Sequence, residues 1–155
     1  MADLEELYRE IILDHYRSPR NRGELASPPA HRTEGFNPLC GDEIVVTIDV
    51  LDGVLQDIKI AGQGCSISQS SASLMSGAVK GKSIPDVRST IATFKTLMLS
   101  HESHLGDGDA EPEAVDLKSL GELAALQGVV KFPVRIKCAT LGWNTLTQAL
   151  DEAGA

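Results

Sequence analysis

The sequence has little of what marks several large classes of protein. Lys and Arg number 14 against 22 Asp and Glu, which gives a formal net charge of −8. Nonspecific nucleic-acid binding relies on a basic surface, so nucleic acid is not expected as a partner. No apolar run approaches membrane-spanning length, and the sequence after Met1 lacks the basic and apolar regions of a secretory signal. We therefore expect a cytoplasmic protein with no membrane partner.

Cysteine is also scarce, with 3 in the chain, and no C-x-x-C pair occurs among Cys40, Cys65 and Cys138. An odd number of cysteines without a secretory signal argues against a disulfide framework. A lone cysteine in such a protein is most often a small buried hydrophobic residue. Each of these three, however, has neighbours that suit a thiolate, and three thiolates with one carboxylate would make a four-ligand metal site.

A neighbouring glycine or arginine supports a ligand role for two of the cysteines. Gly41 permits a sharp turn after Cys40, so the side chain of Asp42 can point to the same place as the thiol. Arg135 precedes Cys138 by three residues on the same face of a predicted helix, where its fixed charge favours a thiolate. Asp42 is thus the predicted oxygen ligand.

Cys65 follows a predicted hairpin and precedes a predicted helix. Alternating apolar residues over 44–50 and 54–60, joined by Asp52-Gly53, predict two antiparallel strands, and 31–36 could add an edge strand. Cys40 precedes the first hairpin strand and Cys65 follows the second, so both are expected at one end of the sheet. Ser66 is predicted to be the N-cap of the next helix, which places Cys65 beside unpaired backbone N–H groups.

The remaining apolar pattern is helical. It predicts helices over 4–15, 66–80, 83–98, 119–128 and from 133 onward, with an irregular connection over 17–32 and a solvated acidic loop over 102–116. Phe94 and Met98 are expected in the core, Trp143 is expected to pack the last helix against the sheet, and His15 and Tyr16 are expected to pack at the end of the first helix. The predicted fold class is α+β, a small antiparallel β-sheet packed against a layer of α-helices, in one domain over 1–155.

The segments around the cysteines resemble a known family. Asn-Pro-Leu-Cys-Gly-Asp, Gly-Gln-Gly-Cys-Ser-Ile-Ser and Arg-Ile-Lys-Cys-Ala-Thr-Leu-Gly-Trp resemble, in the same order, the three cysteine motifs of the NifU/IscU-like iron–sulfur assembly proteins. The resemblance runs from Ile12 to Trp143 and implies the NifU/IscU-like fold.

Two departures from the housekeeping scaffolds of that family indicate a branch. Those scaffolds have His before the last cysteine and a Leu-Pro-Pro-Val-Lys segment, where this chain has Lys137 and Val-Lys-Phe-Pro-Val at 130–134. A lysine ammonium is a poor metal ligand at neutral pH, which favours Asp42 as the fourth ligand. With an acidic insertion at about 101–117, the chain resembles the SufU branch.

That resemblance implies a zinc-binding sulfurtransferase that works with a SufS-type cysteine desulfurase and supplies downstream SUF assembly proteins. The expected ligands of Zn²⁺ are Cys40, Asp42, Cys65 and Cys138. Our hypothesis is that Cys40 accepts the sulfur and that Arg135 orients or stabilises its thiolate or persulfide. Two alternatives stay open, a scaffold in which the same ligands hold a transient [2Fe–2S] cluster and a protein in which zinc is purely structural.

Overall fold

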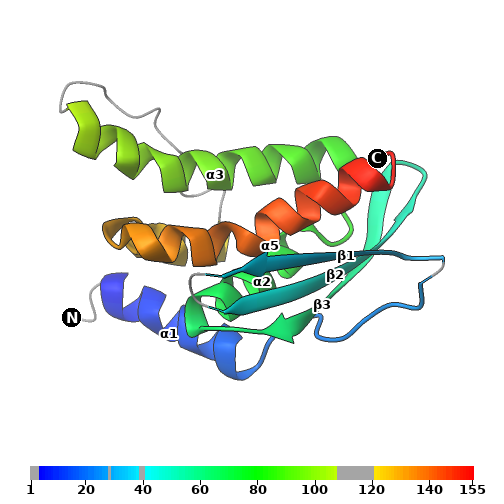
Figure 1. The fold of residues 1–155 in the computed structure, drawn as a ribbon, viewed down its shortest axis with the longest axis horizontal. Coiled ribbons are helices and arrows are strands. Elements are labelled where there is room, and N and C mark those ends of the chain that lie inside the picture. Colours follow the sequence, from blue (N-terminus) through cyan, green and yellow to red (C-terminus); the bar gives the residue numbers. More distant parts are fainter. Residues whose placement is uncertain (1–3, 28, 39–40, 108–120) are drawn as a thin grey trace.

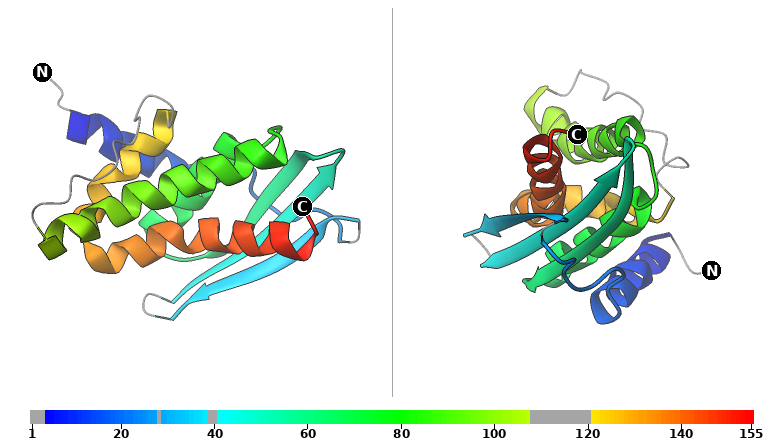
Figure 2. Two further views of the ribbon diagram at one scale, coloured as in Figure 1. Left: turned by 90° about the horizontal axis from the view of Figure 1, so that it is seen from above. Right: turned by 90° about the vertical axis from the view of Figure 1, so that its right-hand side faces the viewer.

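The computed structural model describes residues 4–27, 29–38, 41–107 and 121–155 (Figure 1). Three antiparallel strands form a sheet in the order β1-β2-β3, with bounds His31–Asn37, Asp42–Leu51 and Val54–Gln63. The helices are α1 (Leu4–Arg17), α2 (Ser66–Val79), α3 (Ile84–Asp107), the 3₁₀ helix η1 (Gly121–Lys131) and α5 (Pro133–Glu152). Helices gather on one side of the sheet, as the two views of Figure 2 also show. The predicted α+β class, with its edge strand, is confirmed.

The hairpin of β2 and β3 brings the start of β2 and the end of β3 together at one end of the sheet. Asp52 and Gly53 both have positive φ, 54° and 73°, as a two-residue type I′ turn requires. From this turn the strands pair back to Glu43 opposite Gln63. The first residue of β2 and the chain that leaves β3 therefore lie side by side, as predicted for Cys65; Cys40 lies outside the described residues.

Helix α5 approaches the sheet through small side chains. A Cβ at Gly35 of β1 would overlap Thr145 Oγ1 of α5, and a Cβ at Gly142 would lie 3.2 Å from Ile44 Cδ1 of β2. Glycine at both positions lets the helix lie close to the strands.

Trp143 faces the other way, so the prediction that it packs α5 against the sheet was wrong. Its ring stacks on Phe94 of α3 with centroids 4.2 Å apart and an interplanar angle of 13°. Its Nε1–H donates to Ser71 Oγ of α2 at 3.0 Å. The helical pattern identified a buried residue correctly, but the glycine and threonine beside it take the place against the sheet.

The end of α1 is only partly buried. His15 is 5% exposed and bonds Ser73 Oγ through Nδ1 and Glu122 Oε2 through Nε2, at 2.7 and 2.9 Å, which ties α1 to α2 and η1. Tyr16 is 45% exposed, so its predicted place in the core was wrong. One turn of helix cannot point both neighbouring side chains inward.

Helix α3 is longer than the sequence pattern suggested. It continues to Asp107, because no proline or glycine interrupts the chain between Pro85 and Gly106, so the first residues of the predicted acidic loop are helical. The rest of that loop, 108–116, lies outside the described residues. No helix in the described part of the chain is both long and apolar enough to cross a membrane.

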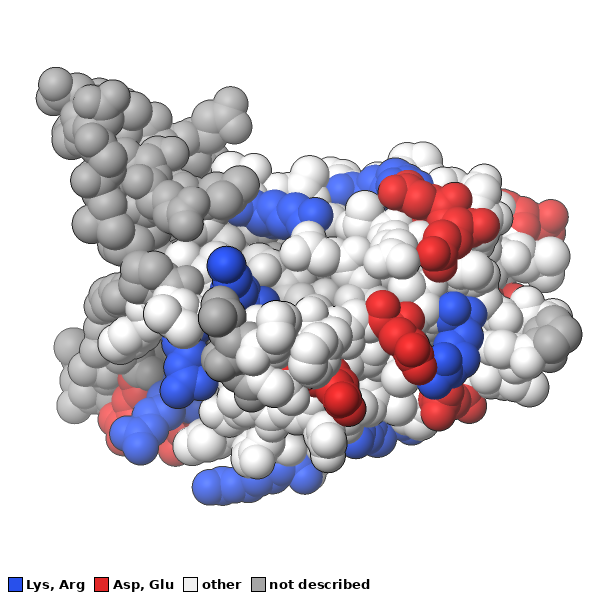
Figure 3. Space-filling model, in the orientation of Figure 1, with Lys and Arg blue, Asp and Glu red and all other residues white. Residues whose placement is uncertain are grey.

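The connection after α1 is irregular, as predicted, and it covers an edge of the sheet. Ile60 of β3 donates its N–H to Asn21 O and accepts the N–H of Gly23, so backbone groups at this edge are paired. On the surface shown in Figure 3, acidic and basic side chains are interspersed, so this face carries no field of one sign.

Candidate metal centre

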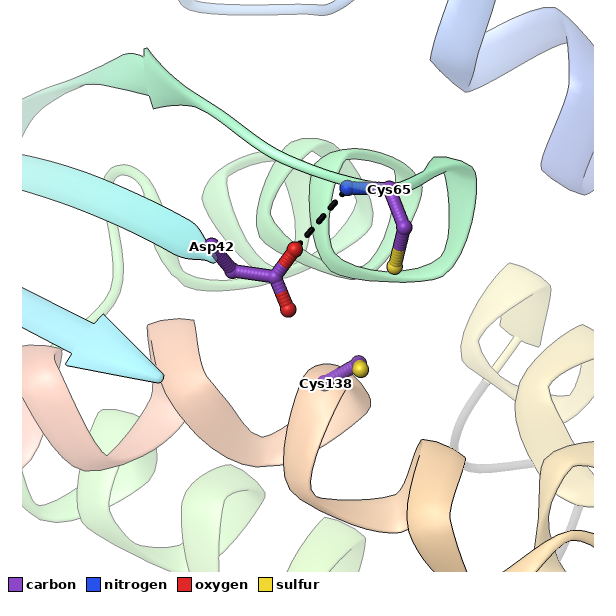
Figure 4. Close-up of side chains that lie close together, drawn as sticks. All are labelled: Asp42, Cys65 and Cys138. Atoms are coloured by element: carbon purple, nitrogen blue, oxygen red, sulfur yellow. Dashed lines mark hydrogen bonds between the residues drawn. The ribbon is translucent and has the colours of Figure 1, made fainter. Parts of the chain in front are cut away.

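Three potential ligands meet at the end of the sheet where the hairpin strands begin and end. Asp42 is the first residue of β2, Cys65 directly precedes α2, and Cys138 lies in the second turn of α5. A carboxylate oxygen and the two sulfur atoms all lie within 4.8 Å of one another. Figure 4 shows the three side chains around one small space, with α2 on one side and α5 on the other.

Asp42 is held in its ionised form although it is fully buried, at 0% exposure. Burial by itself raises the pKa of this carboxyl. The hydrogen bonds that it accepts outweigh burial and hold the pKa below its usual value; the first is from the Cys65 N–H to Oδ1 at 2.9 Å, and the others come from Cys138, Asn37 and Ser68. The site therefore offers a carboxylate rather than a carboxylic acid.

Cys138 is fully buried on α5, at 0% exposure. The next residue, Ala139, accepts a hydrogen bond on its carbonyl from Ser71 Oγ of α2 at 2.6 Å. Ser71 also accepts the Trp143 N–H, so one serine joins α2 to α5 at two positions that follow Cys138. This contact fixes the turn of α5 that presents Cys138 toward Cys65.

The helix after Cys65 begins as predicted, but its N-cap was assigned wrongly by one residue. Helix α2 begins at Ser66, and the N-cap is Cys65 itself, in an extended conformation with φ −72° and ψ 169°. The bond from the Cys65 N–H to Asp42 ties this residue to the sheet and so keeps it out of the helix. Ser68 Oγ donates to the Cys65 carbonyl at 3.1 Å, and the Cys65 thiol lies 3.9 Å from the same hydroxyl.

Sequence reasoning missed Asn37, the last residue of β1. Its side-chain amide donates to Asp42 Oδ2 at 3.3 Å and to Cys138 Sγ at 3.6 Å. The available signal was its place five residues before Asp42, because an antiparallel β1 makes these two residues direct partners. Arg135, by contrast, is an exposed residue one turn before Cys138, and its suggested role stays a prediction.

Gly64 leaves room for the carboxylate. A Cβ at this position would lie 2.5 Å from Asp42 Oδ1 and 2.6 Å from Ser68 Oγ. We expect Gly64→Ala to displace Asp42, to destabilise the protein by about 1–3 kcal/mol and to weaken metal binding at least about tenfold. Chemical unfolding of the metal-free protein and chelator competition measure the two effects.

Gly77 of α2 provides the matched control, since a Cβ there has no heavy atom within 4 Å. Gly77→Ala should stabilise the helix by about 0.5–1 kcal/mol and leave metal binding unchanged. Equal metal affinity in the two variants would show that Gly64 is not needed for the carboxylate.

The donors suit a borderline-soft cation such as zinc. Zinc takes Cys sulfur at about 2.3 Å and carboxylate oxygen at about 2.0–2.2 Å, so tetrahedral ligand atoms lie about 3.5 Å apart. The 4.8 Å span of the three described donors is compatible with one shared ion. Three donors leave one tetrahedral position, and Cys40, which was predicted to fill it, lies outside the described residues.

Comparison with known proteins finds relatives over nearly the whole length of the chain. The family model for the NifU-like N terminal domain matches residues 7–139. A relative named zinc-dependent sulfurtransferase SufU, from Bacillus subtilis, is 42% identical over 99% of this chain and 97% of its own length. One named iron-sulfur cluster assembly scaffold protein IscU, from Streptococcus pyogenes, is 37% identical over 99% of this chain and 88% of its own.

Solved structures of similar proteins share the fold of this chain. A protein from Fervidobacterium islandicum, described as a candidate iron–sulfur cluster assembly scaffold for the SUF system, superposes with a TM-score of 0.79 at 28% identity, over 96% of this chain and 99% of its own. The N-terminal part of a NifU-like protein from Brucella abortus, at 20% identity, shares the fold with a TM-score of 0.70 over 98% and 99% of the two chains. The chain belongs to the family of the NifU-like N-terminal domain.

Proposed function

We propose that this protein is a zinc-dependent sulfurtransferase of iron–sulfur cluster assembly, in the cytoplasm and in one domain over 1–155. It takes sulfur from the persulfide of a SufS-type cysteine desulfurase and passes it to downstream SUF assembly proteins. The observation that carries the proposal is the meeting of Asp42, Cys65 and Cys138 within 4.8 Å. Full-length similarity to a zinc-dependent sulfurtransferase supports it.

In this proposal Cys40, Asp42, Cys65 and Cys138 hold the zinc, which keeps its cysteine ligands deprotonated at neutral pH. The Cys40 thiolate attacks the outer sulfur of the partner's persulfide. The S–S bond of that persulfide breaks, the partner leaves as a thiolate, and Cys40 carries the persulfide. Arg135, whose side chain is exposed, would orient or stabilise the thiolate or persulfide of Cys40.

Accessibility supports this division of roles. Cys138 is fully buried and Cys65 is partly buried, so neither offers a readily approached thiol to a persulfide on a large partner. The acceptor must be reached by the partner, so Cys65 and Cys138 suit the role of metal ligand better than that of sulfur acceptor.

Exposed apolar side chains lie close along the chain to the proposed ligands and offer the desulfurase a docking surface. Phe36 is 59% exposed and precedes Asn37, while Phe132 and Val134 are 63% and 62% exposed at the start of α5, just before Cys138. Aromatic anchors of this kind are enriched at protein interfaces.

Mass spectrometry tests the proposal. Incubation with desulfurase and L-cysteine should add one sulfur atom to Cys40, in protein that holds one zinc per chain and raises the desulfurase rate. Sulfur found only on Cys65 or Cys138 would refute the acceptor assignment. If the protein does not change the turnover rate of the desulfurase, zinc would have a purely structural role.

A cluster scaffold is the second candidate, because cysteine and carboxylate ligands can also hold a transient [2Fe–2S] cluster and relatives named as scaffolds are similar to this chain. Lys137, with its exposed side chain beside Cys138, provides no imidazole ligand for such a cluster. Iron and sulfide bound in stoichiometric amounts, and transferable to an acceptor protein, would favour the scaffold.

A further inference from the structure

Asn37 connects two of the proposed ligands. It is the last residue of β1, directly opposite Asp42 in the ladder, and its side chain is buried at 6% exposure. A buried amide is costly unless its polar atoms are paired. Its Nδ2 lies 3.3 Å from Asp42 Oδ2 and 3.6 Å from Cys138 Sγ, so the two amide protons can serve two different ligands.

Charge fixes the orientation of this amide. The reverse orientation would place the carbonyl oxygen of Asn37 against a carboxylate oxygen and a sulfur, both of which are negative when they bind metal. The donor orientation is therefore favoured with metal bound as well as without it. Because Asn37 is on β1, Asp42 on β2 and Cys138 on α5, one side chain of β1 sets the spacing of ligands from two other elements.

Asp42 accepts hydrogen bonds from Cys65, Asn37, Cys138 and Ser68. Oδ1 accepts the Cys65 N–H at 2.9 Å, and Oδ2 accepts the Asn37 amide. The Cys138 thiol loses its proton when it binds metal, which frees a carboxylate lone pair for the ion. The carboxylate is oriented by its neighbours but keeps its capacity to act as a ligand.

The bond to Cys138 has a chemical consequence. An N–H donated to a thiolate withdraws electron density and lowers its nucleophilicity, yet it leaves the sulfur able to bind metal. The Cys65 sulfur lies 3.9 Å from the Ser68 hydroxyl. The two cysteines are therefore held in chemically different environments.

We propose that Asn37 is a positioning residue of the metal centre, which holds Asp42 and Cys138 at ligand spacing and keeps Cys138 on the metal as a ligand rather than a sulfur acceptor. The proposal rests on the proposed zinc-dependent sulfur transfer. Partners that orient metal ligands typically contribute about 10–100-fold to metal affinity, and we expect an effect of that size here.

Asn37→Leu tests this role, since it keeps the number and branching of the side-chain heavy atoms and removes both donors. Zinc release to a chelator should become about 10–100-fold faster. In the metal-free protein, alkylation of Cys138 should rise relative to Cys65, and the sulfur-to-metal charge-transfer band of the Co²⁺-loaded protein should shift. Asn37→Ser, which is smaller and cannot bridge both ligands, should change all three readouts in the same direction if the leucine variant does not fold.

Thr33→Val is the matched control. It also removes a buried hydrogen-bonding group from β1, the hydroxyl that bonds Glu152 Oε1 at 2.7 Å, far along the strand from the site. It should lower stability but leave zinc release and the Co²⁺ band unchanged. Zinc release within twofold of wild type in the folded Asn37 variants would overturn the inference alone, whereas a wild-type protein that retains no zinc would overturn the proposed function and the inference with it.

Discussion

Cys138→Ala is expected to abolish tight zinc binding. The Cys138 sulfur is one of three described donors within 4.8 Å of one another. Because the residue is fully buried, solvent water does not easily replace its sulfur as a ligand. Loss of a ligand should exceed the 10–100-fold effect of losing a ligand's partner, so we expect an affinity more than about 100-fold lower. Competition with a chromogenic chelator measures the affinity, and metal analysis after gel filtration gives the zinc content.

The same variant should remain folded without metal. Removing one buried sulfur should cost about 0.5–1.5 kcal/mol, the range for a small buried deletion. Denaturant unfolding in the presence of chelator separates this cost from the metal effect. Cys65→Ala should lose zinc in the same way. One zinc retained per chain in either variant, at wild-type affinity, would be incompatible with the proposed ligand set.

Trp143→Ala is expected to give the largest loss of stability, about 3–5 kcal/mol. The ring is fully buried, it stacks on Phe94 at 4.2 Å, and its N–H is bonded to Ser71. A domain of this size is typically stable by about 5–15 kcal/mol, so the variant should unfold at much lower urea concentration. The free energy of unfolding from urea titration is the measurement.

Trp143→Phe is the informative control. It keeps an aromatic ring for Phe94 and loses the bond to Ser71, whose hydroxyl still donates to the Ala139 carbonyl. We expect a smaller loss of about 1–3 kcal/mol, from one hydrogen bond and reduced volume. If alanine and phenylalanine cost the same, the stacking on Phe94 would not be the stabilising contact.

The elements that local rules determine could be predicted from the sequence. The hairpin follows from Asp52-Gly53 between alternating strands, and α3 begins after Ser83, whose Oγ accepts the Asp86 N–H as the cap requires. The hairpin also explains why Asp42 and Cys65 lie together, since antiparallel pairing requires it.

Contacts between distant elements could not be predicted in this way. Helical periodicity shows that Trp143 is buried but not which neighbour it meets, and Gly142 and Thr145 decided that it faces α2 and α3. The charge of Arg135 indicated a thiolate at Cys138, but no local rule placed that thiol beside Asp42 and Cys65. Asn37 was missed because its role depends on the register of β1 and on the position of α5 together.

X-ray absorption at the zinc edge of the purified wild-type protein determines whether the three cysteines and Asp42 bind one zinc ion. We predict one zinc per chain with three sulfur ligands at about 2.3 Å and one oxygen at about 2.0–2.2 Å, from Cys40, Cys65, Cys138 and Asp42. In Asp42→Ala the oxygen contribution should change while the three sulfurs remain. A shell with fewer than three sulfurs in the wild-type protein, or a spectrum that Asp42→Ala leaves unaltered, would contradict this ligand set.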